Sequence, residues 1–276
     1  MKVIASIPAY KESLFLDYAI RSIYQYVDEI IIINTAMRAS LDLGYAHGYQ
    51  LKDGTNEIIQ KWEDKFENVH VISSVAGPKT FKELMDPGLV LAKKLGGDWL
   101  FTVGADEIWP KQTLLPMKTI LGNCDKNGIL GLNVWMHMFA PDFWHCKDFR
   151  NPRFAKITPD CALTHGDSMC WPALGVYQFA GDTMVSVPQG TPDRIAKVNS
   201  DYPRQLRAFH YSCVGEERVK FKSQFYKSFD GSNCDRYVDA YMKKEWSKFK
   251  EMGFKVFTGK HPEVMMEHPM FEEKLI

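Results

Sequence analysis

A chain of 276 residues is long enough to bury a substantial core, and a composition of 45% hydrophobic and 25% charged residues is ordinary for a globular protein. Lysine and arginine together number 34, as do aspartate and glutamate, so the overall charge indicates neither a nucleic acid nor an anionic membrane as partner. The 6 cysteines contain no Cys-x-x-Cys pair, which favours reduced thiols and a cytoplasmic location over a disulfide framework.

An apolar run near the amino terminus, Lys2–Ile7, is too short for a signal peptide and predicts a first strand that ends at Pro8. Ser13 then caps a helical pattern whose apolar residues partly keep helical spacing. The segment Glu29–Ile33 is almost continuously apolar, as a central parallel strand is, and Asn34 ends it. No apolar stretch approaches the length of a membrane span, so we expect a soluble protein.

Strands and helices continue to alternate after a long loop over residues 35–54. The expected elements, in chain order, are a helix over Glu57–Phe66, a strand over Val69–Ser73, a helix over Phe81–Leu95 and a strand over Trp99–Val103. This order implies βαβ crossovers between parallel strands. The fold class is therefore predicted as α/β, with a mostly parallel, doubly wound sheet flanked by helices.

The second half of the chain has a different character. A helix over Gln112–Leu121 and a strand over Gly128–Met138 precede residues 141–201, which are rich in proline, glycine, aromatic residues and histidine. This composition predicts long loops and short strands around a pocket, after which helices return over Glu216–Ser228 and Asp235–Met252. We expect one continuous domain in two halves, residues 1–109 and residues 110–276, of which the second is helical and loop-rich.

Polar side chains stand at three of the predicted strand ends. Asp106 and Glu107 directly follow the fourth strand, Tyr10 and Glu12 follow the first, and Asn34 ends the second. In an open α/β sheet, ligands bind in the crevice beyond the carboxyl ends of the strands, so we expect these groups to converge on one site. A tyrosine there can stack on a flat ring, and carboxylates suit a hard cation. The other interpretation of the two acids is a polar turn after a buried strand.

The segments Pro8–Glu12, Glu29–Asn34 and Gly97–Glu107 together resemble the inverting family-2 glycosyltransferases of the GT-A fold, over roughly the first half of the chain. In that family, the ends of the first two strands hold the base and ribose of a nucleotide-sugar donor. An Asp-x-Asp motif after the fourth strand binds a divalent cation that bridges the two phosphates of the donor.

The resemblance assigns donor contacts to Pro8, Tyr10, Glu12, Asn34, Ala105, Asp106 and Lys222. Tyr10 and Glu12 would flank the base, Asn34 would take the place of a base-binding aspartate, and Asp106 would hold Mn²⁺ or Mg²⁺. His210, which precedes a lysine-rich helix, is the candidate for a further metal ligand or phosphate contact. The alternatives are a packed or helix-capping histidine and a solvated lysine face.

Two positions depart from the family pattern. Gly104 stands where the first aspartate of Asp-x-Asp is expected, and Asn34 replaces an acid. A cation held mainly by Asp106 and by the diphosphate itself would tolerate the loss of the first carboxylate. We then expect weak metal binding in the absence of the donor.

An inverting transfer also needs a carboxylate that takes the proton of the attacking hydroxyl. Asp160 and Asp167 lie in the region expected to face the acceptor, and spacing alone does not choose between them. The acceptor is open: a glycan, a protein side chain, a modified nucleobase or DNA, since basic residues outnumber acidic ones over Tyr202–Lys260. The sequence does not indicate an oligomeric state.

The resemblance implies a metal-dependent glycosyltransferase that moves a sugar from a nucleotide-diphosphate sugar to an acceptor hydroxyl with inversion. The alternative is a non-catalytic nucleotide- or carbohydrate-binding protein, which the missing acid at Gly104 favours. A nucleotidyltransferase would need a glycine- and arginine-rich phosphate loop after the first strand, and Pro8–Glu12 is not one. A zinc site in the middle region would match no closed pattern, so packed side chains are expected there. The residues concerned are His137, His145, Cys146, Cys161, His165 and Cys170.

Overall fold

One sheet of 11 strands runs through both halves of the chain in the computed structural model. The structure describes residues 1–38, 53–73, 77–159, 161–163, 175–180, 183–188, 206–230, 235–243 and 245–271. Within this part of the chain, no helix is long and apolar enough to cross a membrane.

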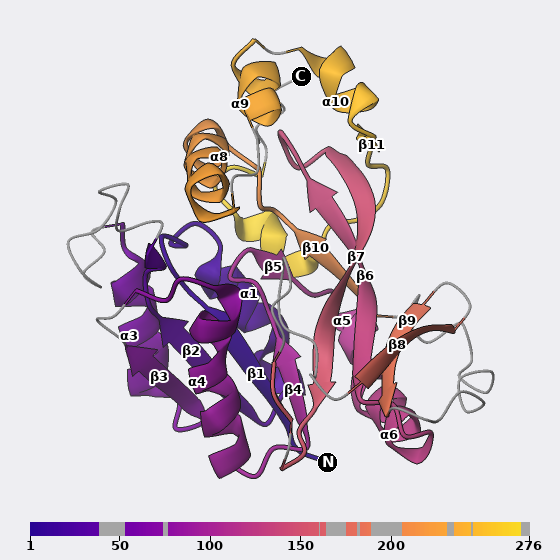
Figure 1. Ribbon diagram of the computed structural model, residues 1–276. Coiled ribbons are helices and arrows are strands. Elements are labelled where there is room, and N and C mark those ends of the chain that lie inside the picture. Colours follow the sequence, from indigo (N-terminus) through magenta and orange to yellow (C-terminus); the bar gives the residue numbers. More distant parts are fainter. Residues whose placement is uncertain are drawn as a thin grey trace.

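Four parallel strands form the amino-terminal part of the sheet (Figure 1). They are β1 (Val3–Pro8), β2 (Glu29–Asn34), β3 (Val69–Ser73) and β4 (Trp99–Thr102), in the spatial order β3-β2-β1-β4. In the register, Ile4 of β1 lies beside Glu29 on one side and Leu100 on the other. Each strand agrees within one residue at either end with the one predicted from its apolar run, and the α/β class is confirmed.

Alternate residues of β1 supply two separate cores, because successive side chains of a strand point to opposite faces. Val3, Ala5 and Ile7 belong to the core covered by α1, α3 and α6, whereas Ile4 belongs to the core beneath α4. These helices are α1 (Leu16–Ile23), α3 (Thr55–Lys65), α4 (Phe81–Lys94) and α6 (Met117–Lys126). Helices on both faces are the doubly wound arrangement that the sequence predicts.

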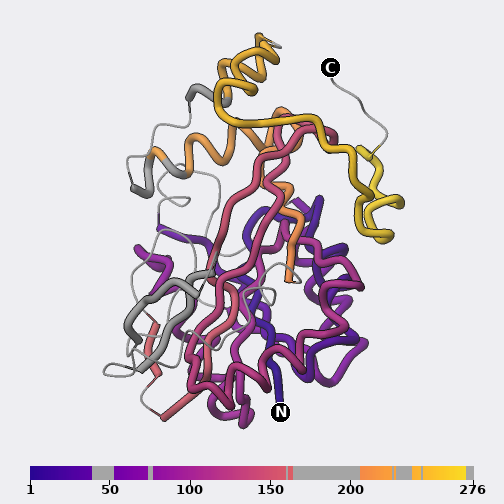
Figure 2. Tube along the Cα trace, turned by 90° about the vertical axis from the view of Figure 1, so that its right-hand side faces the viewer, coloured from indigo at the N-terminus to yellow at the C-terminus, as the bar shows by residue number. Residues whose placement is uncertain are grey.

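Beyond β4 the sheet continues mainly with antiparallel strands. β7 (His145–Lys156) pairs with β4 and with β6 (Gly131–Phe139), and Figure 2 shows β6 and β7 crossing most of the molecule. β10 (Arg207–His210) runs parallel to β6, and β5 (Glu107–Ile108) runs antiparallel to β10. β8 (Gly175–Ala180) pairs with β9 (Thr183–Pro188), which also joins β6.

The 12-residue strand β7 corrects the expectation of loops and short strands over residues 141–201. This strand could not be predicted from the sequence, because it contains Pro152 and proline is normally excluded from central strands. The ladder with β6 shifts register here: Leu132 pairs with Phe154, and Asn133 pairs with Pro152. Arg153 is the extra residue of this irregularity, and a bulge of this kind re-aims a side chain.

Two of the helices predicted for the second half are each divided into two shorter ones. The helix expected over 112–121 is divided into α5 (Lys111–Leu114) and α6, and the one expected over 235–252 into α9 (Asp235–Met242) and α10 (Trp246–Glu251). Near Pro116 the break follows from the missing N–H of proline. α8 (Glu216–Asp230) was predicted at its observed start. Figures 1 and 2 show α9 and α10 at the end of the molecule opposite to the amino terminus.

An aromatic core ties the carboxyl-terminal segments to α1. Phe15 stacks on Tyr211 at 5.7 Å between ring centroids and on His268 at 4.8 Å. The remaining short elements are η1 (Tyr24–Tyr26), β11 (Lys255–Val256) and η3 (Glu263–Glu267). This packing holds β10 and the start of α8 against the carboxyl ends of the parallel strands.

Candidate donor-binding site

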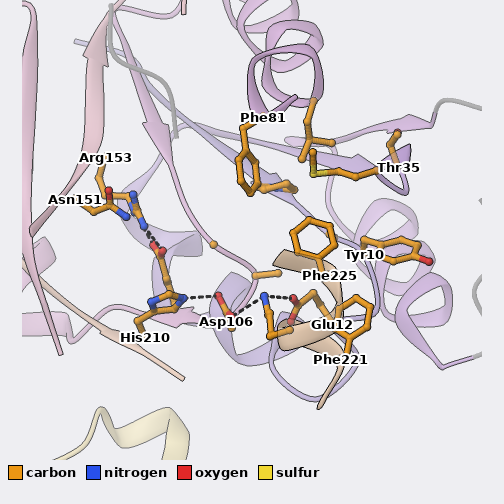
Figure 3. Close-up of a pocket in the computed structure, with 18 residues that line it drawn as sticks. Tyr10, Glu12, Thr35, Phe81, Asp106, Asn151, Arg153, His210, Phe221 and Phe225 are labelled. Atoms are coloured by element: carbon orange, nitrogen blue, oxygen red, sulfur yellow. Dashed lines mark hydrogen bonds and ion pairs between the residues drawn. The ribbon is translucent and has the colours of Figure 1, made fainter. Parts of the chain in front are cut away.

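A pocket of about 820 Å³, part of it open to solvent, lies at the carboxyl ends of β1, β2 and β4 (Figure 3). One side is apolar and aromatic, and the other carries carboxylates, cations and His210. The residues that line it are Pro8, Ala9, Tyr10, Glu12, Thr35, Met37, Phe81, Leu84, Gly104, Ala105, Asp106, Glu107, Asn151, Arg153, His210, Phe221, Lys222 and Phe225.

The end of β1 is fixed by backbone hydrogen bonds. The Ala9 N–H donates to the carbonyl of Ile33 at 3.0 Å, and the Glu12 N–H donates to the Thr55 hydroxyl at 2.9 Å. Between them, Lys11 has φ = +56°, which non-glycine residues rarely adopt. Backbone strain of this kind persists where the surroundings over-determine it, commonly at functional sites.

The turn after β4 presents its two carboxylates in different directions. The Glu107 N–H donates to the carbonyl of Gly104 at 2.9 Å, which closes the turn. A Cβ atom at Gly104 would lie 2.8 Å from the Glu107 carboxylate and 2.9 Å from that of Asp106, so a side chain at this position would have to displace both carboxylates. Glu107, only 1% exposed, is paired with both arms of Arg153, whose Nε donates to it at 2.8 Å. The glycine that interrupts the Asp-x-Asp pattern therefore lets both carboxylates keep their present positions.

Asp106 lies among three nitrogen groups, although it is only 4% exposed. Its Oδ1 is 3.2 Å from His210 Nε2, while its Oδ2 pairs with Arg218 and lies 3.4 Å from Lys222 Nζ. β5 and β10 bring His210 to this position, since Glu107 and His210 are partners in their ladder. Burial alone would raise the pKa of Asp106, but Lys222, His210 and Arg218 hold that pKa well below its usual value.

Arg218 joins the first and fourth strand ends from α8. Its Nη1 lies 2.7 Å from Glu12 Oε2, its other arm pairs with Asp106, and its guanidinium lies 5.1 Å from the centre of the Phe15 ring. Burial would lower the pKa of Arg218, but Glu12 and Asp106 raise it, so the group is always charged. Lys222, one turn further along α8, lies 3.4 Å from Glu12 Oε1.

The apolar side of the pocket contains one polar group without a partner. The Thr35 side chain is 4% exposed, and its hydroxyl has no hydrogen-bond partner among the residues that the structure describes. Figure 3 shows Tyr10, Phe81 and Phe225 around the same space as Thr35. A flat heterocycle in this space would find apolar and aromatic surface together with one hydrogen-bonding hydroxyl.

The structure brings together most of the residues predicted for the site. The predicted residues that line the pocket are Pro8, Tyr10, Glu12, Ala105, Asp106, His210 and Lys222. Asn34 is not among the lining residues: it is buried and donates to Asn56 at 2.9 Å, and its neighbour Thr35 faces the pocket instead. Asp160 and Asp167, the two candidates for the base, lie outside the described residues.

Sequence reasoning assigned no donor-site role to Thr35, Arg153 or Arg218. Arg218 had a usable signal, because it stands four residues before Lys222 and so shares a face of the predicted helix with it. Arg153 had no such signal in the sequence, since its role depends on the bulge in β7.

Asp106, Glu107 and His210 offer possible metal-ligand atoms within 4.8 Å of one another. Both carboxylates, however, are already paired with buried guanidinium groups, Glu107 with Arg153 and Asp106 with Arg218. A divalent cation on the Oδ2 atom of Asp106, at a distance of about 2.1 Å, would lie within about 4 Å of the Arg218 guanidinium, where an effective dielectric constant of about 20 gives a repulsion of about 8 kcal/mol. In this arrangement, the residues do not fit the divalent cation that the resemblance implies.

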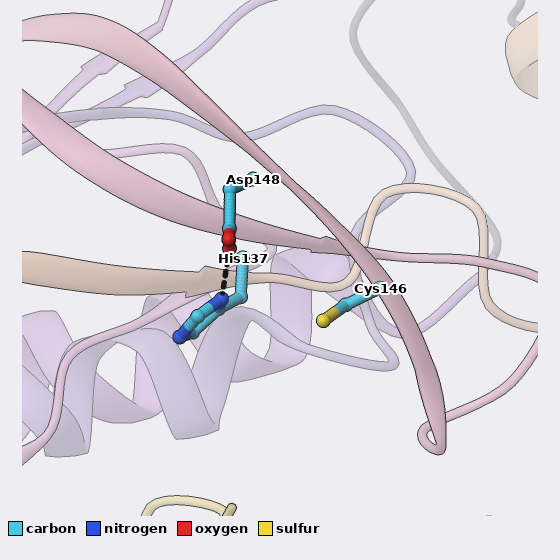
Figure 4. Close-up of side chains that lie close together, drawn as sticks. All are labelled: His137, Cys146 and Asp148. Atoms are coloured by element: carbon cyan, nitrogen blue, oxygen red, sulfur yellow. Dashed lines mark hydrogen bonds and ion pairs between the residues drawn. The ribbon is translucent and has the colours of Figure 1, made fainter. Parts of the chain in front are cut away.

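A second group of possible ligands, His137, Cys146 and Asp148, lies on β6 and β7 (Figure 4). His137 Nδ1 is 2.6 Å from Asp148, and Arg207 donates to His137 Nε2 at 3.0 Å. Lys255 donates to Asp148 at 2.9 Å, and burial raises the pKa of Cys146 to about 11. Both ring nitrogens are occupied, the thiol is protonated and two cations stand nearby. The group is a hydrogen-bonded cluster that links four strands, as expected for packed side chains.

No protein-family model and no curated protein matches this sequence. Among solved structures, the chain is similar to S. aureus TarS 1-349 in complex with UDP, at 10% identity and a TM-score of 0.40, covering 100% of this chain and 76% of that one. A second similar structure is glucosyl-3-phosphoglycerate synthase from Mycobacterium tuberculosis in complex with Mn²⁺, UDP and glucosyl-3-phosphoglycerate. It gives 18% identity and a TM-score of 0.33, and the match covers 50% of this chain and 43% of that one. 4-Diphosphocytidyl-2C-methyl-D-erythritol synthase from Anaerococcus prevotii gives 13% identity and a TM-score of 0.34, and the match covers 56% of this chain and 71% of that one. At these identities and scores the likeness carries no information on function, which has to be argued from the pocket.

Proposed function

We propose that this chain is a glycosyltransferase that takes its sugar from a nucleoside-diphosphate donor. The observation that carries the proposal is the two-sided pocket at the carboxyl ends of β1, β2 and β4. Its aromatic side suits a nucleobase, and Lys222 and His210 on its opposite side suit a diphosphate and the first atoms of a sugar. This position in the sheet is where open α/β folds bind ligands.

The proposed reaction is a single displacement at the anomeric carbon. The acceptor oxygen forms a bond to that carbon, the bond from the carbon to the diphosphate oxygen breaks, and the bonding electrons leave with the nucleoside diphosphate. The acceptor proton passes to a carboxylate, for which Asp160 and Asp167 stay the predicted candidates. Attack from the face opposite to the diphosphate inverts the anomeric configuration, so the inverting outcome is part of the proposal.

Cations have to offset the charge that develops on the departing diphosphate. Lys222 is the lysine that lines the described pocket. Mn²⁺ or Mg²⁺ on Asp106 and His210 stays a prediction from the resemblance, and it competes with the ion pairs that these residues already make.

A screen of nucleotide sugars tests the proposal. We expect one of UDP-glucose, UDP-N-acetylglucosamine, GDP-mannose or dTDP-rhamnose to raise the melting temperature. We also expect that donor to release its nucleoside diphosphate when glycan, peptide or duplex DNA acceptors are added. Asp106→Asn should abolish the release, whereas Glu63→Gln, a matched neutralisation on the exposed face of α3, should not change it.

The anomeric configuration of the product, measured by proton NMR coupling, tests inversion separately. Binding of a donor without release of its diphosphate to any of these acceptors would instead favour the non-catalytic binding protein. If no nucleotide sugar binds, both interpretations of the pocket are wrong.

A further inference from the structure

Two cations of one helix meet the carboxylates of two strand ends. Lys222 lines the pocket and lies 3.4 Å from both Asp106 and Glu12. Arg218, one turn earlier on α8, is buried behind it and pairs with the same two carboxylates. Because four residues make about one helical turn, α8 presents both cations on the face that covers the strand ends.

Both oxygens of Asp106 are engaged in this arrangement. Oδ1 faces His210, and Oδ2 is shared by Arg218 and Lys222. A second acid at position 104 would have to displace the carboxylates of Asp106 and Glu107 from these positions. Compared with an Asp-x-Asp motif, the turn after β4 thus lacks the first ligand for a divalent cation, and Arg218 and Lys222 contact the second ligand, Asp106.

Among the described residues, the charged side chains that meet at the pocket balance before any ligand binds. Three carboxylates, of Glu12, Asp106 and Glu107, face three cations from Arg153, Arg218 and Lys222. Arg153 and Arg218 are nearly fully buried and make short contacts, so they stay with their carboxylates. Lys222 sits at the pocket wall with two longer contacts, and its ammonium is the positive charge that a phosphate can approach directly.

We propose that this chain binds a nucleoside diphosphate without a divalent cation, with Lys222 contacting the phosphates while Arg218 occupies the position on Asp106 that a metal would need. Arg218 is a positioning residue here, since it acts through Asp106 and Glu12. The inference rests on the proposed function, because it concerns the phosphate end of the same donor pocket.

Calorimetric titration of the wild-type chain with UDP, GDP, CDP, ADP and dTDP, in excess EDTA and then in Mn²⁺, tests the inference. At least one of these should bind with the same affinity in both buffers, within about threefold. Binding that requires Mn²⁺ would overturn the inference and leave the proposed function standing. If none of them binds in either buffer, both proposals fail.

Variants of α8 separate the two roles. Lys222→Met should weaken binding of the same nucleoside diphosphate by about 10- to 100-fold in EDTA, as expected for the loss of one charge-assisted phosphate contact. The matched control is Lys220→Gln on the same helix, since Lys220 is 39% exposed and pairs with Glu216; it should bind like the wild type. If both lysine variants bind equally well, Lys222 does not contact the phosphates.

Arg218→Met gives the more specific result. It uncovers Asp106 and Glu12 together, so binding should fall in EDTA and be restored by Mn²⁺, while Arg218→Lys should keep binding independent of the metal. A purely structural role for Arg218 would give the same loss in both buffers and would overturn its part of the inference. If Arg218→Met does not fold, as its melting curve would show, Arg218→Lys with and without Mn²⁺ decides: a metal requirement in that variant would contradict the inference.

Discussion

The buried pair of Glu107 and Arg153 is the clearest place to test how the site is held together. The two side chains are 1% and 2% exposed, and two parallel hydrogen bonds join them across the gap between the turn after β4 and the bulge of β7. Arg153→Met would leave the Glu107 carboxylate buried without its partner. Breaking a buried pair in this way typically costs about 3–5 kcal/mol of the free energy of unfolding.

Removing both charges should cost far less than removing one. The double variant Glu107→Leu/Arg153→Met removes both charges of this pair and leaves neither partner unpaired, and such replacements are often neutral or stabilising. We expect its free energy of unfolding to lie within about 1–2 kcal/mol of the wild type, which gives a coupling energy of at least about 2 kcal/mol. Urea denaturation followed by the fluorescence of the 7 tryptophans measures each value.

The same strand provides a matched control. Lys156 of β7 pairs with Asp125 at 2.9 Å, but both side chains are partly exposed, so Lys156→Met should cost less than about 1 kcal/mol. A cost for Arg153→Met no larger than that of this control would refute the reasoning. So would a double variant whose loss of stability equals the sum of the two single losses.

Three further predictions concern other parts of the chain. Burial lowers the pKa of His261 from 6.5 to about 4, so between these pH values the unfolded chain binds a proton that the folded chain does not, and stability should fall as the pH drops through that window. The contribution is at most about 3 kcal/mol, and urea midpoints measured from pH 7 to pH 4 should vary less in His261→Gln than in the wild type. Gly88→Ala should cost about 1–3 kcal/mol by thermal melting, because its Cβ would lie 2.5 Å from the Ser6 hydroxyl, and Ser6→Ala in the same chain should recover most of the loss. Thr35→Val should weaken nucleoside diphosphate binding by about fivefold or more without lowering the melting temperature, whereas Thr35→Ser should not; equal affinities would show that the hydroxyl contacts no ligand.

The amino-terminal half could be predicted from the sequence because its strands are buried on both faces. A strand such as Glu29–Asn34 is then almost continuously apolar and stands out from its surroundings. β7 could not be predicted in the same way. It carries Pro152 and several charged residues, and its place in the sheet depends on pairing with β4 and on a bulge opposite β6. These are tertiary contacts that a local pattern does not contain.

The site could likewise be predicted only in part, where it depends on the order of the strands and not on contacts between distant segments. The strand ends that carry Tyr10, Glu12 and Asp106 follow from the order of strands, and these residues do meet in one pocket. At the end of β2, neighbouring side chains point to opposite faces of the sheet. A shift of one residue therefore decides whether Asn34 or Thr35 faces the pocket. Arg218 is separated from Asp106 by 112 positions in the chain, so their pairing depends on how α8 packs.

Gly104 shows why a departure from a motif has to be interpreted in its structure. In the sequence it is a missing ligand, which favours a weakened metal site or a non-catalytic protein. In the structure it is the position where the turn after β4 folds so tightly that both following carboxylates stand within 3 Å of a would-be Cβ. An aspartate at this position would add a third negative charge to the same small volume and would displace Asp106 and Glu107 from Arg218 and Arg153. The glycine and the two buried arginines are therefore parts of one arrangement, in which the two carboxylates fill the space of a second acid and Arg218 lies where a metal on Asp106 would otherwise lie.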